Sequence, residues 1–250
     1  MATWGAHFRI AENILRKYTK LNRGIFAIGT IAPDCGIPNN NRTSFTPPKD
    51  ISHFTISKEE FMVIKLDKFI LKDTEFFSKY LTDLNINSLS SSQTFKFGYF
   101  NHLLTDNLWN YYIMKPLKEE HLNELRLDPK FIWKVKSDWY DLDKMYLTEN
   151  KDSLFWTDFL NAEYNEDFLD FLPREAILRQ LEFIKKFYQI SEEEYKKVLK
   201  KEYIYLKKEE MDKFIKDSTQ IILDILEQII EKKYKLMGKT SFLDDIISWN

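Results

Sequence analysis

Two side chains with metal-binding chemistry lie four residues apart in the segment FGYFNHLLTDNLW. At this spacing His102 and Asp106 would project from one face of a helix, so both could bind a single cation. A neutral imidazole and a carboxylate suit zinc or another borderline metal. The same pair often forms only a surface hydrogen bond, so the spacing by itself leaves both interpretations open.

Further candidate ligands lie earlier in the chain. His7 follows Thr-Trp-Gly-Ala near the start, and Asp34 opens the loop APDCGIPNNNRTSFTPPKD. His53 follows this loop in the tripeptide Ser-His-Phe. Taken separately, these histidines could each be partly buried and hydrogen-bonded to backbone or carboxylate groups. The last of the four histidines, His121, lies in a charged segment and is expected to be solvated.

Taken together, these residues resemble the zinc-dependent phospholipase C family, whose distant relatives include the single-strand-specific zinc nucleases. The resemblance covers about residues 1–115 and depends on short motifs in the family's order and at comparable separations. The matching positions are Trp4 with His7, Asp34, His53, and His102 with Asp106. The resemblance implies an all-α protein, a multi-helix phospholipase C-like bundle with a metal-binding cleft.

The resemblance also implies how these residues would divide between two ions. One zinc ion would bind to Asp34, His53, His102 and Asp106. A second ion would bind to His7, and Asp106 would bridge the pair, because two close dications need negative charge between them. Asp34 could also orient or deprotonate a water molecule, which makes it the candidate catalytic residue. We therefore expect one or two zinc ions, and another divalent transition metal would also suit these ligands.

Two features depart from the family pattern. In secreted relatives the Trp is the first residue of the mature chain, and its amine and carbonyl bind metal. Here residues 1–3 precede Trp4, so that contact requires processing or is lost. The relatives also bind a third zinc through two further His and a Glu, but only His121 remains here, so that site cannot be complete. The carboxylates that could replace it are Glu119, Glu120, Asp138 and Asp141.

Periodicity and composition predict the fold. Only six of the 250 residues are Gly, which leaves few tight turns for an all-β fold. We therefore expect residues 1–250 to form a single all-helical domain with less than about a tenth of residues in strands. Apolar spacing predicts helices over 6–20, 58–82, 93–114, 117–126, 129–148, 174–189, 192–204 and 208–236. Residues 25–32 could be a strand or a helical turn, and residues 33–50 should be an irregular loop.

Charge and cysteine content limit the classes of function. A net charge of −2, with Lys and Glu intermixed, does not predict binding to duplex nucleic acid. No apolar run approaches the roughly 18 residues of a membrane span, and charges in the first helix argue against a signal peptide. A single Cys fits a reducing compartment, so we expect a cytoplasmic protein. Cys35 itself is expected to be a small buried thiol.

The favoured function is metal-dependent hydrolysis of a phosphoester or phospholipid, in which a metal-bound water attacks phosphorus. A non-catalytic protein with a structural or regulatory metal site is the alternative, because the third site is incomplete. A single-strand nuclease is a further alternative. It would use aromatic residues, which make up 16% of the chain, for base stacking, but the charge balance argues against it.

Overall fold

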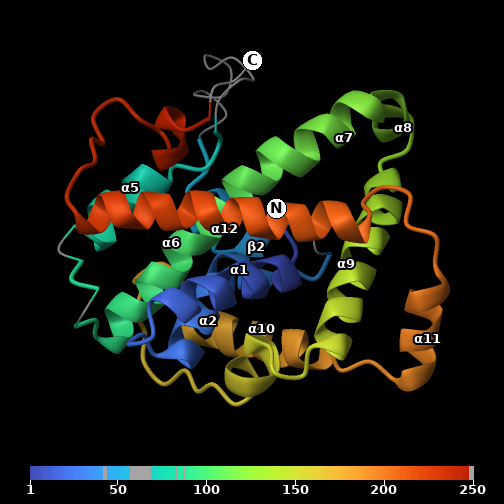
Figure 1. Ribbon diagram of the computed structural model, residues 1–250, viewed down its shortest axis with the longest axis horizontal. Helices are drawn as coiled ribbons and strands as arrows, with labels where there is room; N and C mark the ends of the chain where they lie inside the picture. The colour runs from blue at the N-terminus through green and yellow to red at the C-terminus, as the bar shows by residue number, and fades with distance from the viewer. Residues whose placement is uncertain (42–43, 57–68, 83, 87, 248–250) are drawn as a thin grey trace.

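Helices dominate the computed structural model, with 65% of residues in helix and 3% in strand. The structure describes residues 1–41, 44–56, 69–82, 84–86 and 88–247 (Figure 1). The predictions of an all-helical protein and of little strand are therefore confirmed. The α-helices are α1 (Trp4–Lys17), α2 (Arg23–Ile31), α3 (Lys49–Ser52), α5 (Asp73–Tyr80), α6 (Ser91–Trp109), α7 (Lys115–Glu120), α8 (Leu122–Leu127), α9 (Phe131–Glu149), α10 (Arg174–Phe187), α11 (Glu192–Lys200) and α12 (Lys208–Ile230).

Short elements connect these helices. They are the 3-10 turns η1 (Ala32–Asp34) and η4 (Phe242–Asp245), the π-helical turns η2 (Asn110–Met114) and η3 (Phe155–Phe159), and the strands β1 (Ile37–Pro38) and β2 (Phe45–Thr46). The two strands form one antiparallel ladder within the expected loop. Within the described ranges, no helix is both long enough and apolar enough to cross a bilayer.

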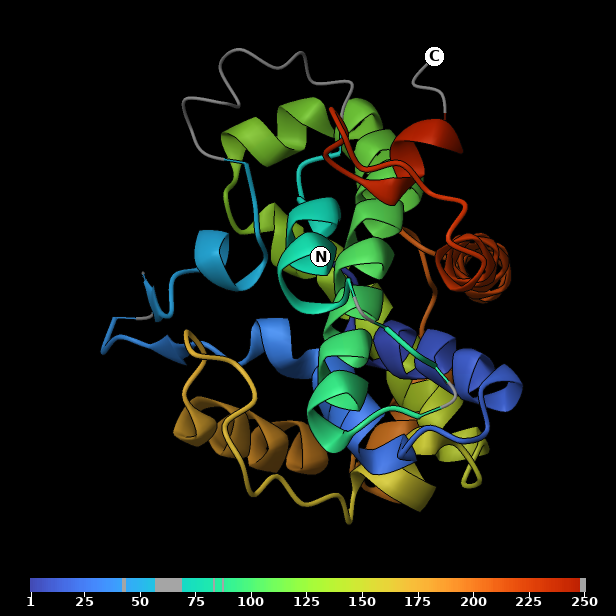
Figure 2. The same ribbon diagram turned by 90° about the vertical axis from the view of Figure 1, so that its left-hand side faces the viewer.

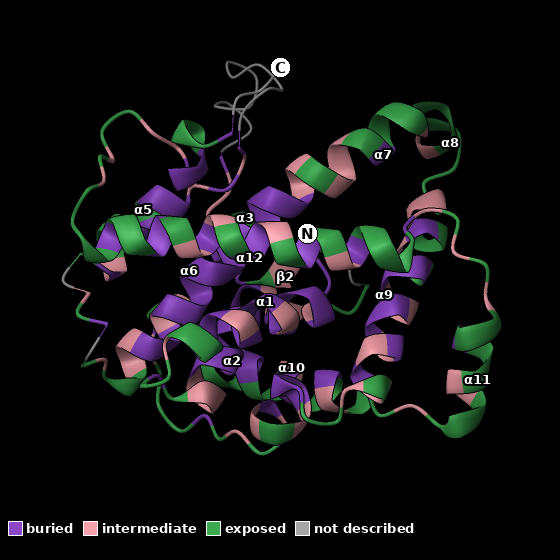
Figure 3. Cartoon of the chain, in the orientation of Figure 1, coloured by how far each residue is buried: buried purple, intermediate pink, exposed green. Residues whose placement is uncertain are grey.

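Helix α6 runs through the middle of the molecule and is the main support of the fold (Figure 2). Ser90 begins it with a capping box, in which its hydroxyl accepts from the backbone of Gln93 and the Gln93 side chain accepts in return. Nearly every residue from Thr94 to Trp109 is buried, as the purple ribbon shows (Figure 3). A helix that is buried on all sides must be covered by neighbours on all sides.

Helix α2 approaches α6 so closely that two glycines are required. A Cβ atom on Gly29 would lie 2.1 Å from the carbonyl oxygen of Phe95, and one on Gly98 would lie 2.3 Å from that of Phe26. Both distances are far inside van der Waals contact, so any side chain at these positions would push the helices apart. The spacing of the two helices is therefore fixed by backbone contact.

Helix α1 packs against α6 and also contacts two helices from much later in the chain. Asp143 of α9 accepts hydrogen bonds from the Thr3 hydroxyl at 2.8 Å and from the Gly5 amide at 3.2 Å. Arg9 binds Asp212 of α12 at 2.6 Å, and α12 runs next to α1 in Figure 1. The N-terminal helix therefore lies between elements that follow it by more than a hundred residues.

Several expected boundaries differ from those observed. Residues 25–32, left undecided, form α2 and the start of η1, and the span 117–126 is broken at His121 into α7 and α8. Of the expected helix 58–82, residues 58–68 lie outside the described residues, and α5 covers part of the remainder. Ser191 caps α11, and its hydroxyl accepts from the amide of Glu194.

Helices α11 and α12 end earlier than their apolar periodicity predicts. Helix α11 ends at Lys200, because the backbone turns extended at Lys201 and the following bend is held by Asp138, which accepts from the amides of Ile204 and Tyr205. Helix α12 ends at Ile230 rather than near residue 236, and Lys232 takes a left-handed conformation with φ of 55°. Gly238 lies in a later turn, beyond the end of this helix.

Candidate metal centre

Five side chains from four separate segments meet beside α6. This helix carries His102 and Asp106 on one face, and the His102 Nε2 to Asp106 Oδ2 distance is 3.3 Å. From α1, His7 Nε2 lies 3.5 Å from Asp106 Oδ1. His53, directly after α3, places its Nε2 at 3.3 Å from Asp34 Oδ1 and at 3.8 Å from Asp106 Oδ2. The structure thus brings together all five residues that the sequence singled out.

These distances match the size of a zinc coordination shell. Two ligands that are each 2.0–2.1 Å from a tetrahedral ion are about 3.3–3.4 Å apart. The ligand atoms of two overlapping sets lie within 4.8 Å of one another: His7, Asp34 and His102 form one set, and His53, His102 and Asp106 form the other. The sequence expectation had assigned His7 to a separate ion, whereas here it shares a set with Asp34.

Four of the polar atoms that face one another at the centre have no hydrogen-bond partner among the described residues. The exposed fraction is 1% or less for His7, His53, His102 and Asp106. Among the described residues, the Nε2 atoms of the three histidines and Asp106 Oδ2 make no hydrogen bond. Buried nitrogen and oxygen atoms are normally paired, so lone pairs that converge in this way fit a cation. The donor set of imidazole nitrogen and carboxylate oxygen is one that zinc accepts.

Neighbouring groups orient these ligands from behind. His102 Nδ1 donates to the Thr30 carbonyl at 2.8 Å, since a carbonyl can only accept, and this directs Nε2 toward the centre. His53 Nδ1 lies 3.0 Å from the Ser52 hydroxyl. Such outer contacts fix the ring orientation of metal-binding histidines. Thr30 could not be found from the sequence, because its contribution comes from the backbone carbonyl.

Trp4 contacts the centre through its side chain. Its indole N–H donates to Asp34 Oδ2 at 2.9 Å, and its backbone belongs to the first turn of α1. The backbone group that reaches the centre belongs to Ala2, whose amide donates to Asp106 Oδ1 at 2.6 Å. The backbone contact that the family makes through its Trp is therefore not made by Trp4.

Protonation at the centre follows from burial and from the mutual proximity of the groups. Burial, followed by the neighbouring His102, lowers the pKa of His7 to about 4, and the two rings stack with centroids 3.9 Å apart. Burial would raise the pKa of Asp106, but His102 holds it well below its usual range. Burial would also raise the pKa of Asp34, but the adjacent His53 holds it well below its usual range. A neutral imidazole and ionised carboxylates are the forms that bind a metal.

His102 behaves differently from His7. Burial lowers its pKa, but the adjacent Asp106 carboxylate has the larger effect, so the pKa is raised. A metal ion would therefore compete with a proton for His102 Nε2, and binding of the ion should release that proton.

The carboxylates considered for a third ion serve other purposes. Lys201 binds Asp138 at 3.0 Å and Asp141 at 2.7 Å, so both charges are already compensated. Glu119 and Glu120 are exposed on α7. His121 was expected to be solvated, but its side chain is 21% exposed and packs against Phe131 and Tyr205. Within the described residues, these groups therefore assemble no third site.

Cys35 is a buried thiol, as expected. It is 1% exposed and its Sγ donates to the Ile31 carbonyl at 3.4 Å. Burial, together with the charge of Asp34, raises the pKa of the thiol well above its usual value. A thiol in this state is a poor nucleophile.

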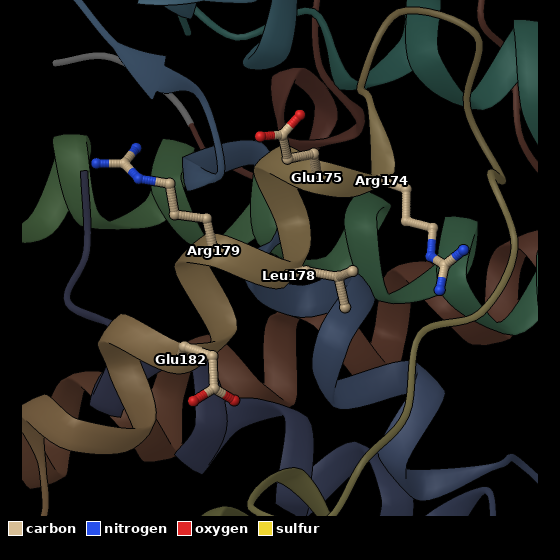
Figure 4. A pocket seen from close by; sticks show the side chains of 5 residues that line it. All are labelled: Arg174, Glu175, Leu178, Arg179 and Glu182. Carbon is tan, nitrogen blue, oxygen red and sulfur yellow. The ribbon is translucent and has the colours of Figure 1, made fainter.

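A surface hollow on α10 lies apart from the centre. Figure 4 shows that its side chains project from one helix in different directions and do not converge on a point. They are Arg174, Glu175, Leu178, Arg179 and Glu182. None of them is a candidate ligand, so the expected metal-binding cleft does not coincide with this hollow.

Comparison of the chain with family models, curated proteins and solved structures found no match. The functional argument therefore depends on the geometry of the centre and on the sequence motifs, and the phospholipase C resemblance stays a prediction.

Proposed function

We propose that this protein is a metal-dependent phosphoester hydrolase of the phospholipase C type, with one or two zinc ions at the centre. The observation that carries this proposal is the convergence of three imidazole nitrogens and two carboxylates on one buried point. The order of the motifs along the chain supports the same proposal. The substrates that fit it are phosphodiesters and phospholipid head groups.

The residues would divide the work as follows. Asp106 directs Oδ1 toward His7 and Oδ2 toward His53 and His102, which is the arrangement that a bridging carboxylate requires. Asp34 is the most accessible of the five, with a side chain 11% exposed, so it is the ligand best placed to orient a water molecule at the edge. Bound zinc would lower the pKa of that water and stabilise charge on the phosphoryl oxygens.

The test begins with metal loading. The purified protein should retain one or two equivalents of zinc after dialysis, measured by plasma emission spectrometry. The loaded protein is then assayed with bis(p-nitrophenyl) phosphate, phosphatidylcholine vesicles and a single-stranded oligonucleotide. Hydrolysis of either of the first two that chelation abolishes and zinc restores would support the proposal. Failure to bind any divalent transition metal would refute it.

A structural or regulatory metal site is the second candidate, and the burial of the ligands favours it. Four of the five are 1% exposed or less, and structural zinc sites are usually closed to solvent. This alternative predicts a fully loaded protein that hydrolyses none of the substrates but melts at a much lower temperature once the metal is removed. Cleavage of the oligonucleotide alone would instead identify a single-strand nuclease.

A further inference from the structure

One face of α9 follows the edge of the metal centre. Asp143, Tyr140 and Lys136 lie on this face, because they are separated by three and four residues. Asp143 binds the first turn of α1. The ring of Tyr140 lies 6.5 Å from that of Trp4, whose indole binds Asp34. One turn further toward the start of α9, the same face presents the side chain of Lys136.

Lys136 is half-buried, and the part of the chain that the structure describes offers its ammonium group no anionic partner. Among the described residues, no carboxylate oxygen lies within 4.0 Å of it and no hydrogen bond is made. Its Nζ rests 5.1 Å from the ring centroid of Trp133. Removing an ammonium from water without a partner is unfavourable, so this placement needs an explanation.

The charged groups that act on Lys136 are another lysine and the two carboxylates of the centre. Burial, followed by the charge of Lys49, lowers the pKa of Lys136, while Asp34 and Asp106 raise it. Lys136 therefore interacts with both carboxylates of the centre without forming an ion pair with either. Lys49 begins α3, four residues before His53, so the two cations belong to different elements.

We propose that Lys136 binds a nonbridging phosphoryl oxygen of an anionic phosphate ester held at the metal centre, with Lys49 as a second cation at its edge. This inference rests on the proposed function and specifies the ligand class of the same site. A lysine ammonium is a common point-charge partner for phosphate. A purely structural site would gain nothing from it, since a nearby cation repels the bound metal.

The test measures binding of inorganic phosphate to the zinc-loaded protein by isothermal titration calorimetry. Lys136→Met keeps most of the side-chain shape without the charge, and should weaken phosphate binding about tenfold or more. Lys136→Arg keeps the charge and should retain most of the affinity. Lys134→Met is the matched control, because that exposed lysine on α9 lies over Tyr205 instead, and its affinity should not change.

Metal content and circular dichroism of each variant separate the possible failures. Equal phosphate affinity in Lys136→Met and wild type, at equal zinc content and fold, would overturn the inference. A zinc-loaded wild type that binds no phosphate would overturn it as well. A wild type that takes up no metal would refute the proposed function instead. If Lys136→Met unfolds, Lys136→Gln provides the same comparison.

Discussion

The change Asp106→Asn replaces one carboxylate oxygen with an NH2 group at the point where the five candidate ligands meet. The two carboxylate oxygens lie between 3.3 and 3.8 Å from the Nε2 atoms of the three histidines. Structural zinc binds with about 10–16 kcal/mol, or about 3 kcal/mol for each of four ligands. An amide nitrogen cannot act as a ligand and carries no charge. Binding of the first ion should therefore weaken by about 100-fold or more, and a second ion should be lost.

The change His7→Ala should behave differently, because His7 reaches only one of the two Asp106 oxygens. If the wild type holds two ions, the zinc content should fall by one equivalent while the other ion stays. If the protein is a two-metal hydrolase, phosphodiesterase activity should fall by about 100-fold or more. If the site is structural, the main effect of either variant should be a lower melting temperature.

Both variants are measured for zinc content after dialysis and for melting temperature with and without a chelator. Asp138→Asn is the matched control, since it removes another buried carboxylate, one that binds Lys201 away from the centre. This control should lose stability but no metal. Full metal retention by Asp106→Asn would refute the bridging assignment.

Three further predictions concern the groups around the centre. Gly29→Ala should lower the free energy of unfolding by about 2–3 kcal/mol in urea titrations, because its Cβ would meet the Phe95 carbonyl. Trp4→Phe removes the N–H that binds Asp34, and calorimetry should show about tenfold weaker zinc binding. Burial raises the pKa of Asp143 to about 6, above about 4 when unfolded. Its contribution to stability is therefore greatest below about pH 4 and falls by about 2–3 kcal/mol toward pH 6; Asp143→Asn should flatten that slope.

The parts of the fold with a strong apolar period could be predicted from the sequence. Helices α6, α9 and α10 begin within two residues of their expected positions. The π-helical turns η2 and η3 could not be predicted, because they depend on packing rather than on residue type. The end of α11 was also missed, since the contact that stops it comes from Asp138, more than sixty residues earlier.

In the candidate centre, too, some residues could be predicted from local sequence and others depend on packing. Its five ligands could be proposed because His is rare in this chain and Asp106 follows His102 at helical spacing. The Thr30 carbonyl could not, because it meets His102 only through the packing of α2 against α6, 72 residues apart in the chain. Local sequence carries no record of such contacts.

The position of α1 has a consequence for synthesis on the ribosome. Its first partners on α9 and α12, Asp143 and Asp212, emerge long after the helix itself. At about 5–20 residues per second, some 200 residues take about 10–40 s to translate. During that interval the apolar face of α1, including Phe8 and Ile14, lacks its full cover. Chaperones that recognise exposed apolar segments should therefore bind the nascent chain through this helix until α12 has left the exit tunnel.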